Sequence, residues 1–329
     1  MCQEPQAEVA ELTLCKFQFY IWCHMPKDRR PNISQPEHEI LCSLNQFYFL
    51  SAPQVQRLHY SPKILYHVQT LLKSLSDKHL ALRTYYLKTS YYGHSASRGK
   101  TAFVYSLSSQ AQRYLRDLGI ETDFKFNPEQ EIAHSNQHLL HTLALNDFLI
   151  SAKLLPKAIP QVSLEELRHE RQLKREADRV TIERADGAKE QVAVIPDGWL
   201  DFSVLPPGRD RPIQFCIALE RDRGSTEQKA FRQRIRARVA WSQGAYQKHF
   251  GTTSLTTAYV VSPAGKRLAD VRKWAEAELE ALGRKGSELF LFTDLDPATA
   301  SPQDLFLSAY WYEPFKTQPV SLINALPPA

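Results

Sequence analysis

Apolar residues recur at helical spacing from residue 36 to residue 78 and predict three consecutive helices. The first covers residues 36–50. The second is short, with Ser51 as its N-cap and Pro53 in its first turn, where a missing N–H costs nothing. The third covers 62–78, and its apolar face contains Ile64, Val68, Leu71, Leu72 and Leu75. A short helix tightly joined to the next one predicts a helix-turn-helix.

A β-hairpin is predicted directly after these helices. Apolar residues 80–83 and 101–107 flank a tip rich in Gly, Ser, Lys and Arg. Ser108 or Ser109 then caps another helix, which ends at Gly119. Three helices followed by such a hairpin form a winged-helix pattern, assigned to residues 36–122, with residues 1–35 as an N-terminal extension.

Polar residues of the predicted third helix and of the hairpin tip are candidates for contacts with double-stranded DNA. Lysine and arginine would bind phosphates and release counterions, and Gln69 would read a base edge. The candidates are Lys63, His67, Gln69 and Lys73 on the helix, and Arg98 and Lys100 on the tip. The alternative is a winged helix that makes only protein contacts.

A long helix over residues 127–155 is predicted within a connecting segment, residues 123–160. His134, His138 and His141 follow each other on it at spacings of four and three, which would suit a metal ion. The competing interpretation is that these histidines form hydrogen bonds beside the leucines of the same helix.

Residues 161–329 alternate between apolar runs and helical stretches, which predicts an α/β domain with a central mixed sheet. Residues 163–166 are interpreted as a cap before a highly charged helix that carries Glu170. Residues 180–196 predict a β-hairpin around the turn at Asp186-Gly187.

Carboxylates stand at the ends of two apolar runs in this domain. Asp197 follows residues 192–195, and Glu220 and Asp222 follow residues 213–219. Acids held where a rigid strand emerges can share one hard cation through oxygen ligands. Alternating charges at a strand end can instead simply pair with each other.

A basic helix is predicted after these acids, from about residue 226 to residue 246. Ser225 or Thr226 is the expected N-cap. The cations of this helix are spread around it, and Arg232 and Arg236 are candidates for DNA phosphates.

The order of hairpin, Pro-Asp, strand with Glu-x-Asp and basic helix resembles the PD-(D/E)xK restriction-endonuclease-like nucleases. In that family two motif acids and a helix glutamate hold Mg²⁺, and a lysine orients the attacking water. By this resemblance Asp197 and Glu220 are the motif acids, and Glu170 is the helix acid. Asp222 stands where the family has lysine, so Asp222 is a further candidate ligand and Lys229 is the candidate for the ammonium.

A longer resemblance, over about residues 36–295, is to the replication-relaxation family of bacterial plasmids and integrative elements. It rests on the winged-helix pattern, the histidine-bearing helix, Pro-Asp-Gly at 196–198, and Glu-x-Asp-Arg-Gly with Thr-Glu at 220–227, with Ser225 inserted. Arg234-Ile235 stands where the family often has Lys-Leu, and Arg238 where it often has Tyr. The resemblance implies DNA binding in the replication or transfer of a mobile element, together with replication, transposition or other mobile-element proteins.

Composition agrees with a two-domain globular protein, because 329 residues with 43% hydrophobic and 23% charged residues are ordinary values. The net charge of +5 permits a polyanionic partner. No apolar run approaches the roughly 18 residues of a membrane span, and no signal peptide is recognised, so we expect a location in the bacterial cytoplasm. Five scattered cysteines indicate neither a disulfide framework nor a zinc site.

Two functional hypotheses follow. In the first, the winged helix docks on duplex DNA and the nuclease-like domain nicks it with Mg²⁺. In the second, the protein is a non-catalytic DNA-binding regulator or adaptor that recruits replication, transposition or defence proteins. The direction of the acids distinguishes them, because acids paired with arginines favour the adaptor.

Overall fold

The computed structural model describes residues 32–87, 101–123, 125–134, 136–184, 187–263 and 265–326. Two compact units make up the chain, unit 1 up to Ile150 and unit 2 from Ser151 to the C-terminal end. The division falls within the connecting segment that the sequence predicts. Arg98, Lys100 and most of the N-terminal extension lie outside the described residues.

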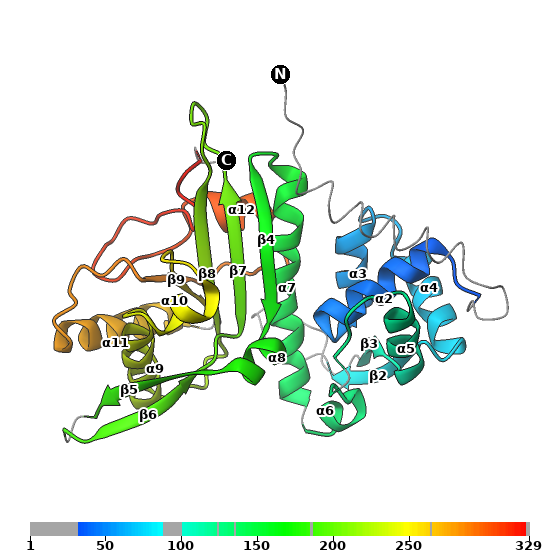
Figure 1. The fold of residues 1–329 in the computed structure, drawn as a ribbon, viewed down its shortest axis with the longest axis horizontal. Helices are drawn as coiled ribbons and strands as arrows, with labels where there is room; N and C mark the ends of the chain where they lie inside the picture. The colour runs from blue at the N-terminus through cyan, green and yellow to red at the C-terminus, as the bar shows by residue number, and fades with distance from the viewer. Residues whose placement is uncertain are drawn as a thin grey trace. The chain divides into compact units, whose positions relative to one another are not determined.

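Unit 1 contains helices and a small sheet in the predicted order (Figure 1). Its elements are α2 (Gln35–Phe47), β1 (Leu50–Ser51), α3 (Ala52–His59), α4 (Leu65–Asp77), β2 (Ala81–Leu87), β3 (Thr101–Leu107), α5 (Ser109–Asp117), α6 (Pro128–His134) and the start of α7 (Asn136–Ala158). The strands form an antiparallel sheet in the order β1-β3-β2. The helix predicted over 127–155 thus corresponds to two helices, α6 and α7.

The caps of these helices explain their boundaries. The backbone N–H of Ser51 donates to the side chain of Gln54 at 3.0 Å, closing the first turn of α3. The Ser108 hydroxyl accepts from the backbone N–H of Ala111 at 3.1 Å and fixes the start of α5. Both capping serines are the ones that the sequence predicts.

Unit 2 is built on one five-stranded mixed sheet. Its elements after α7 are β4 (Val162–His169), α8 (Glu170–Leu173), β5 (Asp178–Glu183), β6 (Lys189–Val194), β7 (Gly198–Val204), β8 (Ile213–Asp222), α9 (Gln228–Trp241), α10 (Ala245–Phe250), β9 (Thr256–Val261), α11 (Arg267–Ala281), β10 (Phe290–Thr293) and α12 (Pro302–Leu307). The strand order is β10-β9-β8-β7-β4, with β4, β7 and β8 antiparallel and β8, β9 and β10 parallel. The mixed sheet of the predicted α/β fold is confirmed. β5 and β6 form a separate two-stranded hairpin.

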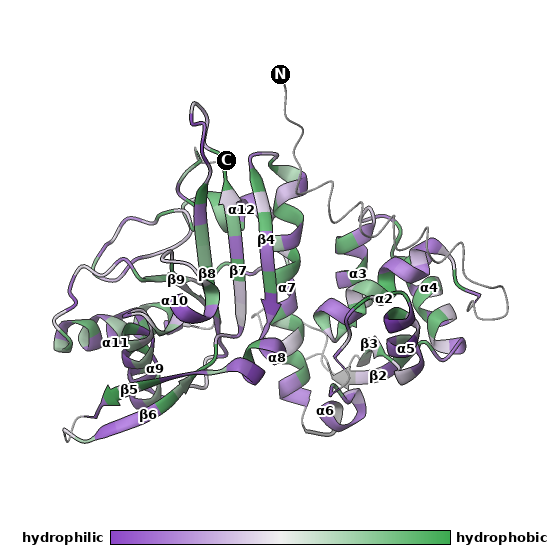
Figure 2. Ribbon diagram, viewed as in Figure 1, coloured by the Kyte–Doolittle hydropathy of each residue, from purple (hydrophilic) through white to green (hydrophobic). Residues whose placement is uncertain are grey.

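The prediction of a charged helix after residues 163–166 is wrong, because residues 162–169 form strand β4 and only the short α8 follows. β4 pairs with β7 alone, at the edge of the sheet, with most of its residues partly exposed. An edge strand tolerates charges, so its sequence lacks the apolar run of an interior strand. Figure 2 shows hydrophilic residues at the β4 end that leads into α8, and along β6.

The basic helix is shorter than predicted. It starts at Gln228 with Glu227 at the N-cap position, and α9 ends at Trp241, before Gly244 with φ of +138°. Phe231 and Ile235 of α9 join a buried cluster with Val271 and Leu279 of α11, while Trp241 packs with Trp199 of β7. α9 is therefore anchored along its length between the sheet and α11.

Among the described residues, no helix combines the length and the apolar character that a bilayer crossing requires.

Candidate functional site

Glu170 and Asp197 lie next to each other because of strand register. Glu170 directly follows β4, which ends at His169, and Asp197 directly precedes β7, which begins at Gly198. β4 and β7 run antiparallel, and His169 pairs with Gly198. The residues one step beyond this pair must therefore meet, and carboxylate oxygens of Glu170 and Asp197 lie within 4.8 Å of each other. Glu170, Asp197, Glu220 and Asp222 are called the acid edge below.

Asp197 is also fixed against β8. Its backbone N–H donates to the carbonyl of Leu219 at 2.9 Å, and its carboxylate accepts from the backbone N–H of Arg221 at 2.6 Å. The sequence suggested that Asp197 ends a strand, whereas β6 stops at Val194 and Asp197 introduces β7. Two neighbouring strands thus hold this carboxylate in one direction.

Glu220 lies inside β8, and its carboxylate is buried in an ion pair with Arg238 of α9. The side chains of Glu220 and Arg238 are each 7% exposed, and Arg238 also donates to the carbonyl of Ile195 at 3.0 Å. Burial raises the pKa of Glu220 to about 7, an effect that Arg238 opposes and the nearby Asp197 reinforces. A carboxyl that holds a proton near neutral pH is a weaker ligand for a hard cation than the other acids.

Asp222 is satisfied by a second arginine. Both of its carboxylate oxygens accept from Arg267 of α11, at 2.7 and 2.8 Å, and one also accepts from the backbone N–H of Gly224 at 3.1 Å. Its side chain is 2% exposed. Asp222 therefore ties the end of β8 to α11, and the bidentate pair occupies the oxygens that a metal would need.

Lys229, the candidate for the catalytic ammonium, lies on a different side of α9 from the acid edge. A helix turns by about 100° per residue, so Lys229 and Arg238, nine residues apart, point in opposite directions. Arg238 contacts Glu220, whereas Lys229 is exposed and lines a cavity with Arg232 and Arg236.

These motifs lie within a family match. The model of a family described as replication-relaxation matches residues 41–256. The chain belongs to the replication-relaxation family. Membership suggests a role in the replication or transfer of plasmids or other mobile elements. Neither the curated proteins nor the solved structures gave a significant match.

The replication-relaxation match includes both the helices of unit 1 and the acid edge of unit 2. Arg238 stands where the resemblance leads one to expect tyrosine, and the packing of α9 explains the position of its side chain. Arg238 lies three residues from Ile235 and three from Trp241, both buried, so its side chain belongs to the apolar face of α9. That spacing is the signal by which the partner of Glu220 could have been found in the sequence.

The DNA-contact candidates on and just before α4 are exposed, with Gln69 and Lys73, four residues apart, on one side of the helix and His67, two residues from Gln69, on another. Val68, Leu72 and Leu75 of α4 are buried, which leaves the opposite side of the helix in solvent. Lys63, before α4, and His67, Gln69 and Lys73 on it are not buried. The His67 ring packs edge-on against Tyr60, with centroids 5.9 Å apart, so His67 is held more firmly than the others.

Tyr66 lies on the same side of α4 as Gln69 and Lys73 and was missed from the sequence. Its side chain is 83% exposed. Tyr66, Gln69, Thr70 and Lys73 recur at intervals of three and four, which aligns them in one stripe along α4. The signal that could have found Tyr66 in the sequence is its spacing of three and seven residues from Gln69 and Lys73.

The histidines of the connecting segment differ from one another. Nε2 of His138 lies 3.3 Å from a carboxylate oxygen of Glu131, and His141 is buried. The side chain of His134 lies outside the described part of the chain.

Proposed function

We propose that this protein binds duplex DNA through the exposed face of α4, as a winged-helix domain does, and nicks one strand at the acid edge during replication or transfer of a mobile element. The convergence of Glu170 and Asp197 at the β4–β7 pair carries the proposal. The order of the β5–β6 hairpin, Asp197, β8 with Glu220 and Asp222, and α9 supports it, because it follows the hairpin, Pro-Asp, strand and basic helix of the nuclease-like sequence pattern.

Magnesium suits the donors that the chain provides here. Mg²⁺ takes oxygen ligands about 2.1 Å away, so two ligand oxygens on one ion lie roughly 3 to 4 Å apart. The Glu170 and Asp197 oxygens, within 4.8 Å, are close to that spacing. When bound, Mg²⁺ would polarise the phosphate and lower the pKa of the attacking water.

The two carboxylates have different surroundings. The Arg221 N–H orients Asp197, whereas Glu170 forms an ion pair with Lys174 at 2.6 Å through one oxygen, which a cation would have to share or displace. Because Glu220 stands beside Asp197 in a pair with Arg238, it adds little further negative charge to the site. Asp197 and Glu170 are therefore the ligands proposed first.

The test measures nicking of supercoiled DNA with Mg²⁺ or Mn²⁺. Asp197→Asn and Glu170→Gln should each lower the nicking rate by at least about 100-fold, since each removes one ligand charge without changing side-chain size. Glu183→Gln, an exposed acid of β5, is the matched control and should keep the wild-type rate. Nicking that persists in Asp197→Asn would refute the assignment.

Binding is tested separately by a titration of duplex DNA at several salt concentrations. Lys63→Ala/Lys73→Ala should weaken binding and lower the salt slope by about 1 for each phosphate that the protein no longer neutralises. Arg113→Ala/Arg116→Ala, two exposed arginines of α5, is the charge-matched control. An equal weakening in both pairs would mean that α4 is not a special contact surface.

A second function is favoured by the arginine pairs of the acid edge. Glu220 and Asp222 are each held by an arginine, as expected of a DNA-binding adaptor that does not cut. DNA binding that depends on α4, without metal-dependent nicking of any DNA form, would establish the adaptor in place of the nuclease.

A further inference from the structure

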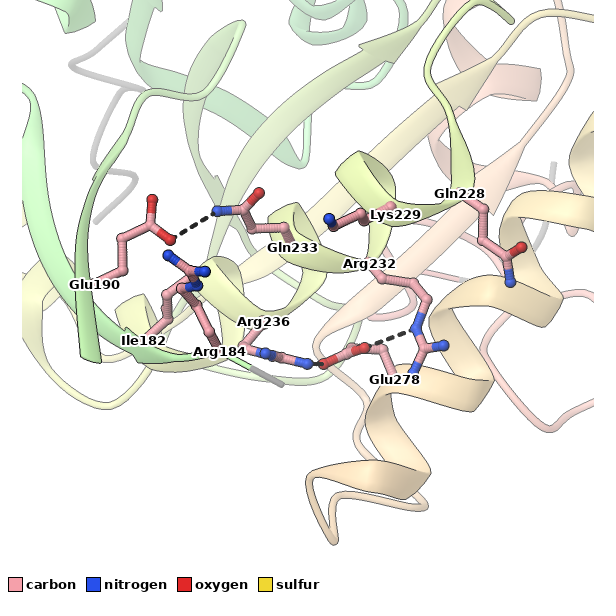
Figure 3. A pocket seen from close by; sticks show the side chains of 9 residues that line it. All are labelled: Ile182, Arg184, Glu190, Gln228, Lys229, Arg232, Gln233, Arg236 and Glu278. Atoms are coloured by element: carbon pink, nitrogen blue, oxygen red, sulfur yellow. Dashed lines mark hydrogen bonds and ion pairs between the residues drawn. The ribbon is translucent and has the colours of Figure 1, made fainter. Parts of the chain in front are cut away.

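A polar cavity of about 700 Å³ lies in unit 2 between the β5–β6 hairpin, α9 and α11 (Figure 3). We call it the basic cleft. Its lining residues are Ile182, Arg184, Glu190, Gln228, Lys229, Arg232, Gln233, Arg236 and Glu278. Ile182 is the one apolar residue in this set, and the other lining side chains each end in a charged or amide group.

Glu278 organises the floor of the basic cleft. Its carboxylate is 1% exposed and accepts from Nε of Arg232 at 2.8 Å and from Nε of Arg236 at 2.7 Å. Figure 3 shows the two guanidinium groups on either side of this carboxylate. Arg232 uses Nε in this bond, and its side chain is 36% exposed, so the outer nitrogens of the guanidinium face outward. One buried acid thus positions two planar cations.

The charges of the basic cleft do not balance. Even without Arg184, the lining holds three cations, Lys229, Arg232 and Arg236, against two acids, Glu190 and Glu278. Glu278 is shared by two arginines, and Glu190 lies 3.5 Å from the amide of Gln233. Lys229 is exposed and forms no ion pair with any described residue. The excess positive charge is therefore directed at whatever occupies the cleft.

The basic cleft is separate from the acid edge. At about 100° per residue, Lys229, Arg232 and Arg236 lie on the side of α9 away from Arg238, which contacts Glu220. A ligand in the basic cleft therefore contacts α9 from the other side and leaves Glu220 and its partner undisturbed.

We propose that the basic cleft binds phosphate groups of a DNA strand, as a second DNA contact that rests on the proposed DNA-binding function. The outward-facing nitrogens of the pre-positioned Arg232 guanidinium match the geometry of phosphate oxygens. Arg236 adds positive charge beside them while it bonds to Glu278 and to the Glu183 carbonyl, and Lys229 adds a mobile cation. The amides of Gln228 and Gln233 can donate to or accept from sugars and bases. Most lining residues carry a charge or an amide, so affinity comes chiefly from charge, and cations that neutralise DNA phosphates release condensed counterions.

The test measures DNA binding by the full chain without divalent metal, using fluorescence anisotropy of labelled duplex and single-stranded oligonucleotides at several salt concentrations. Arg184→Gln/Lys229→Gln removes two exposed cations and leaves Glu278 with both of its arginines. Its affinity should fall about tenfold at moderate salt, and its salt slope by about 1 to 2. Arg184→Lys/Lys229→Arg keeps the charges and should retain most of the affinity.

The charge-matched control is Arg211→Gln/Lys273→Gln, two exposed cations of unit 2 outside the basic cleft. It should bind as the wild type does. If Arg184→Gln/Lys229→Gln also matches the wild type while Lys63→Ala/Lys73→Ala binds weakly, the basic cleft is not a DNA contact and the proposed function stands. If the wild-type chain binds no DNA, both proposals fail.

Competitors separate the remaining sources of anionic groups. Suppose that inorganic phosphate or polyglutamate binds the wild type but not Arg184→Gln/Lys229→Gln, while the two proteins bind DNA with equal affinity. The basic cleft would then be a site for free phosphate or for an acidic peptide. Either result would overturn the proposal. If DNA competes with these anions for the wild-type protein, and this competition is lost in Arg184→Gln/Lys229→Gln, the proposal is supported.

Discussion

A buried glutamate is paired with arginine on each of two sides of α9, but the two arrangements differ. On one side Glu220 and Arg238 form a buried pair, with both side chains 7% exposed. On the other, the 1% exposed Glu278 is shared by Arg232 and Arg236, which are 36% and 22% exposed. One arrangement is closed and balanced, and the other is open and carries surplus positive charge.

This difference indicates which side faces a ligand. A balanced buried pair attracts no further charge, and its residues fix the position of α9 against the sheet. An acid that cannot neutralise both of its arginines leaves part of their charge for a partner. A basic helix can therefore serve the interior and the surface at once, with exposure deciding the role of each cation.

The largest expected effect comes from breaking the balanced pair. Arg238→Ala should lower the free energy of unfolding by about 3 kcal/mol at pH 8, because Glu220 is then buried as an unpaired carboxylate. Burial already raises the pKa of Glu220 to about 7, so in the folded state Glu220 keeps its proton at pH values where the unfolded chain has lost it. The folded state therefore loses stability as pH rises toward 7. Without Arg238 this loss extends to higher pH.

The stability loss caused by Arg238→Ala should consequently be much smaller at pH 5, where Glu220 is protonated in both the wild type and the variant. Urea unfolding at pH 5 and pH 8, followed by the fluorescence of Trp199 and Trp241, measures it. Lys273→Ala, an exposed lysine of α11, is the control and should change stability by less than about 0.5 kcal/mol. An equal penalty at the two pH values would contradict a charge-based role for Arg238.

Arg232 and Arg236, which share Glu278, should show energetic coupling in their effects on stability. Arg232→Gln or Arg236→Gln alone should cost about 1 kcal/mol, because Glu278 keeps one partner. Removing both leaves Glu278 buried without a cation and should cost about 0.5 kcal/mol more than the sum of the single changes. A double-mutant cycle in urea measures this, and additivity would show that the two arginines act independently.

Removing the acid instead of the arginines should have a smaller effect. Glu278→Gln keeps the size and a hydrogen-bond acceptor, and both arginines are exposed enough to regain water. We expect a decrease of less than about 1 kcal/mol in the free energy of urea unfolding. A decrease as large as that of Arg238→Ala would mean that both sides of α9 are closed pairs.

The smallest expected effect concerns a buried titratable group without an acidic partner. His38 of α2 is 1% exposed and bonds to the Tyr114 hydroxyl at 3.0 Å, and burial lowers its pKa. The unfolded chain then binds a proton more readily, so stability from this group is lost as pH falls below about 6.5. His38→Gln should flatten the pH dependence of the free energy of urea unfolding between pH 7 and pH 5. An unchanged slope in the variant would exclude His38 as the source of that dependence.

Much of the fold is predictable because local signals agree with the final structure. Ser51 and Ser108 cap helices as expected, and the apolar runs of β8 and β9 mark the interior of the sheet. β4 is not predictable in this way, because its charged sequence satisfies a helix pattern equally well. Only the pairing of β4 with β7 makes it a strand.

The site is predictable in part for a related reason. Glu170 and Asp197 follow from resemblance, but the register that brings them together does not follow from spacing alone. The choice of Arg238 from among the cations of α9 as the partner of Glu220 depends on how that helix packs. Arg232 and Arg236 were assigned to DNA without the shared acid Glu278, since a contact to α11 links residues more than 40 positions apart.

The parallel half of the unit 2 sheet has a consequence for synthesis. β9 joins β8 only after α9 and α10 have been made, and β10 follows α11. Chains emerge from the ribosome at about 5 to 20 residues per second, and domains fold as units. Unit 1 is therefore complete several seconds before the centre of the other sheet can close. During that interval the nascent chain would already present the face of α4, while β8 still lacks its second neighbour, β9, and is the strand most in need of protection from aggregation.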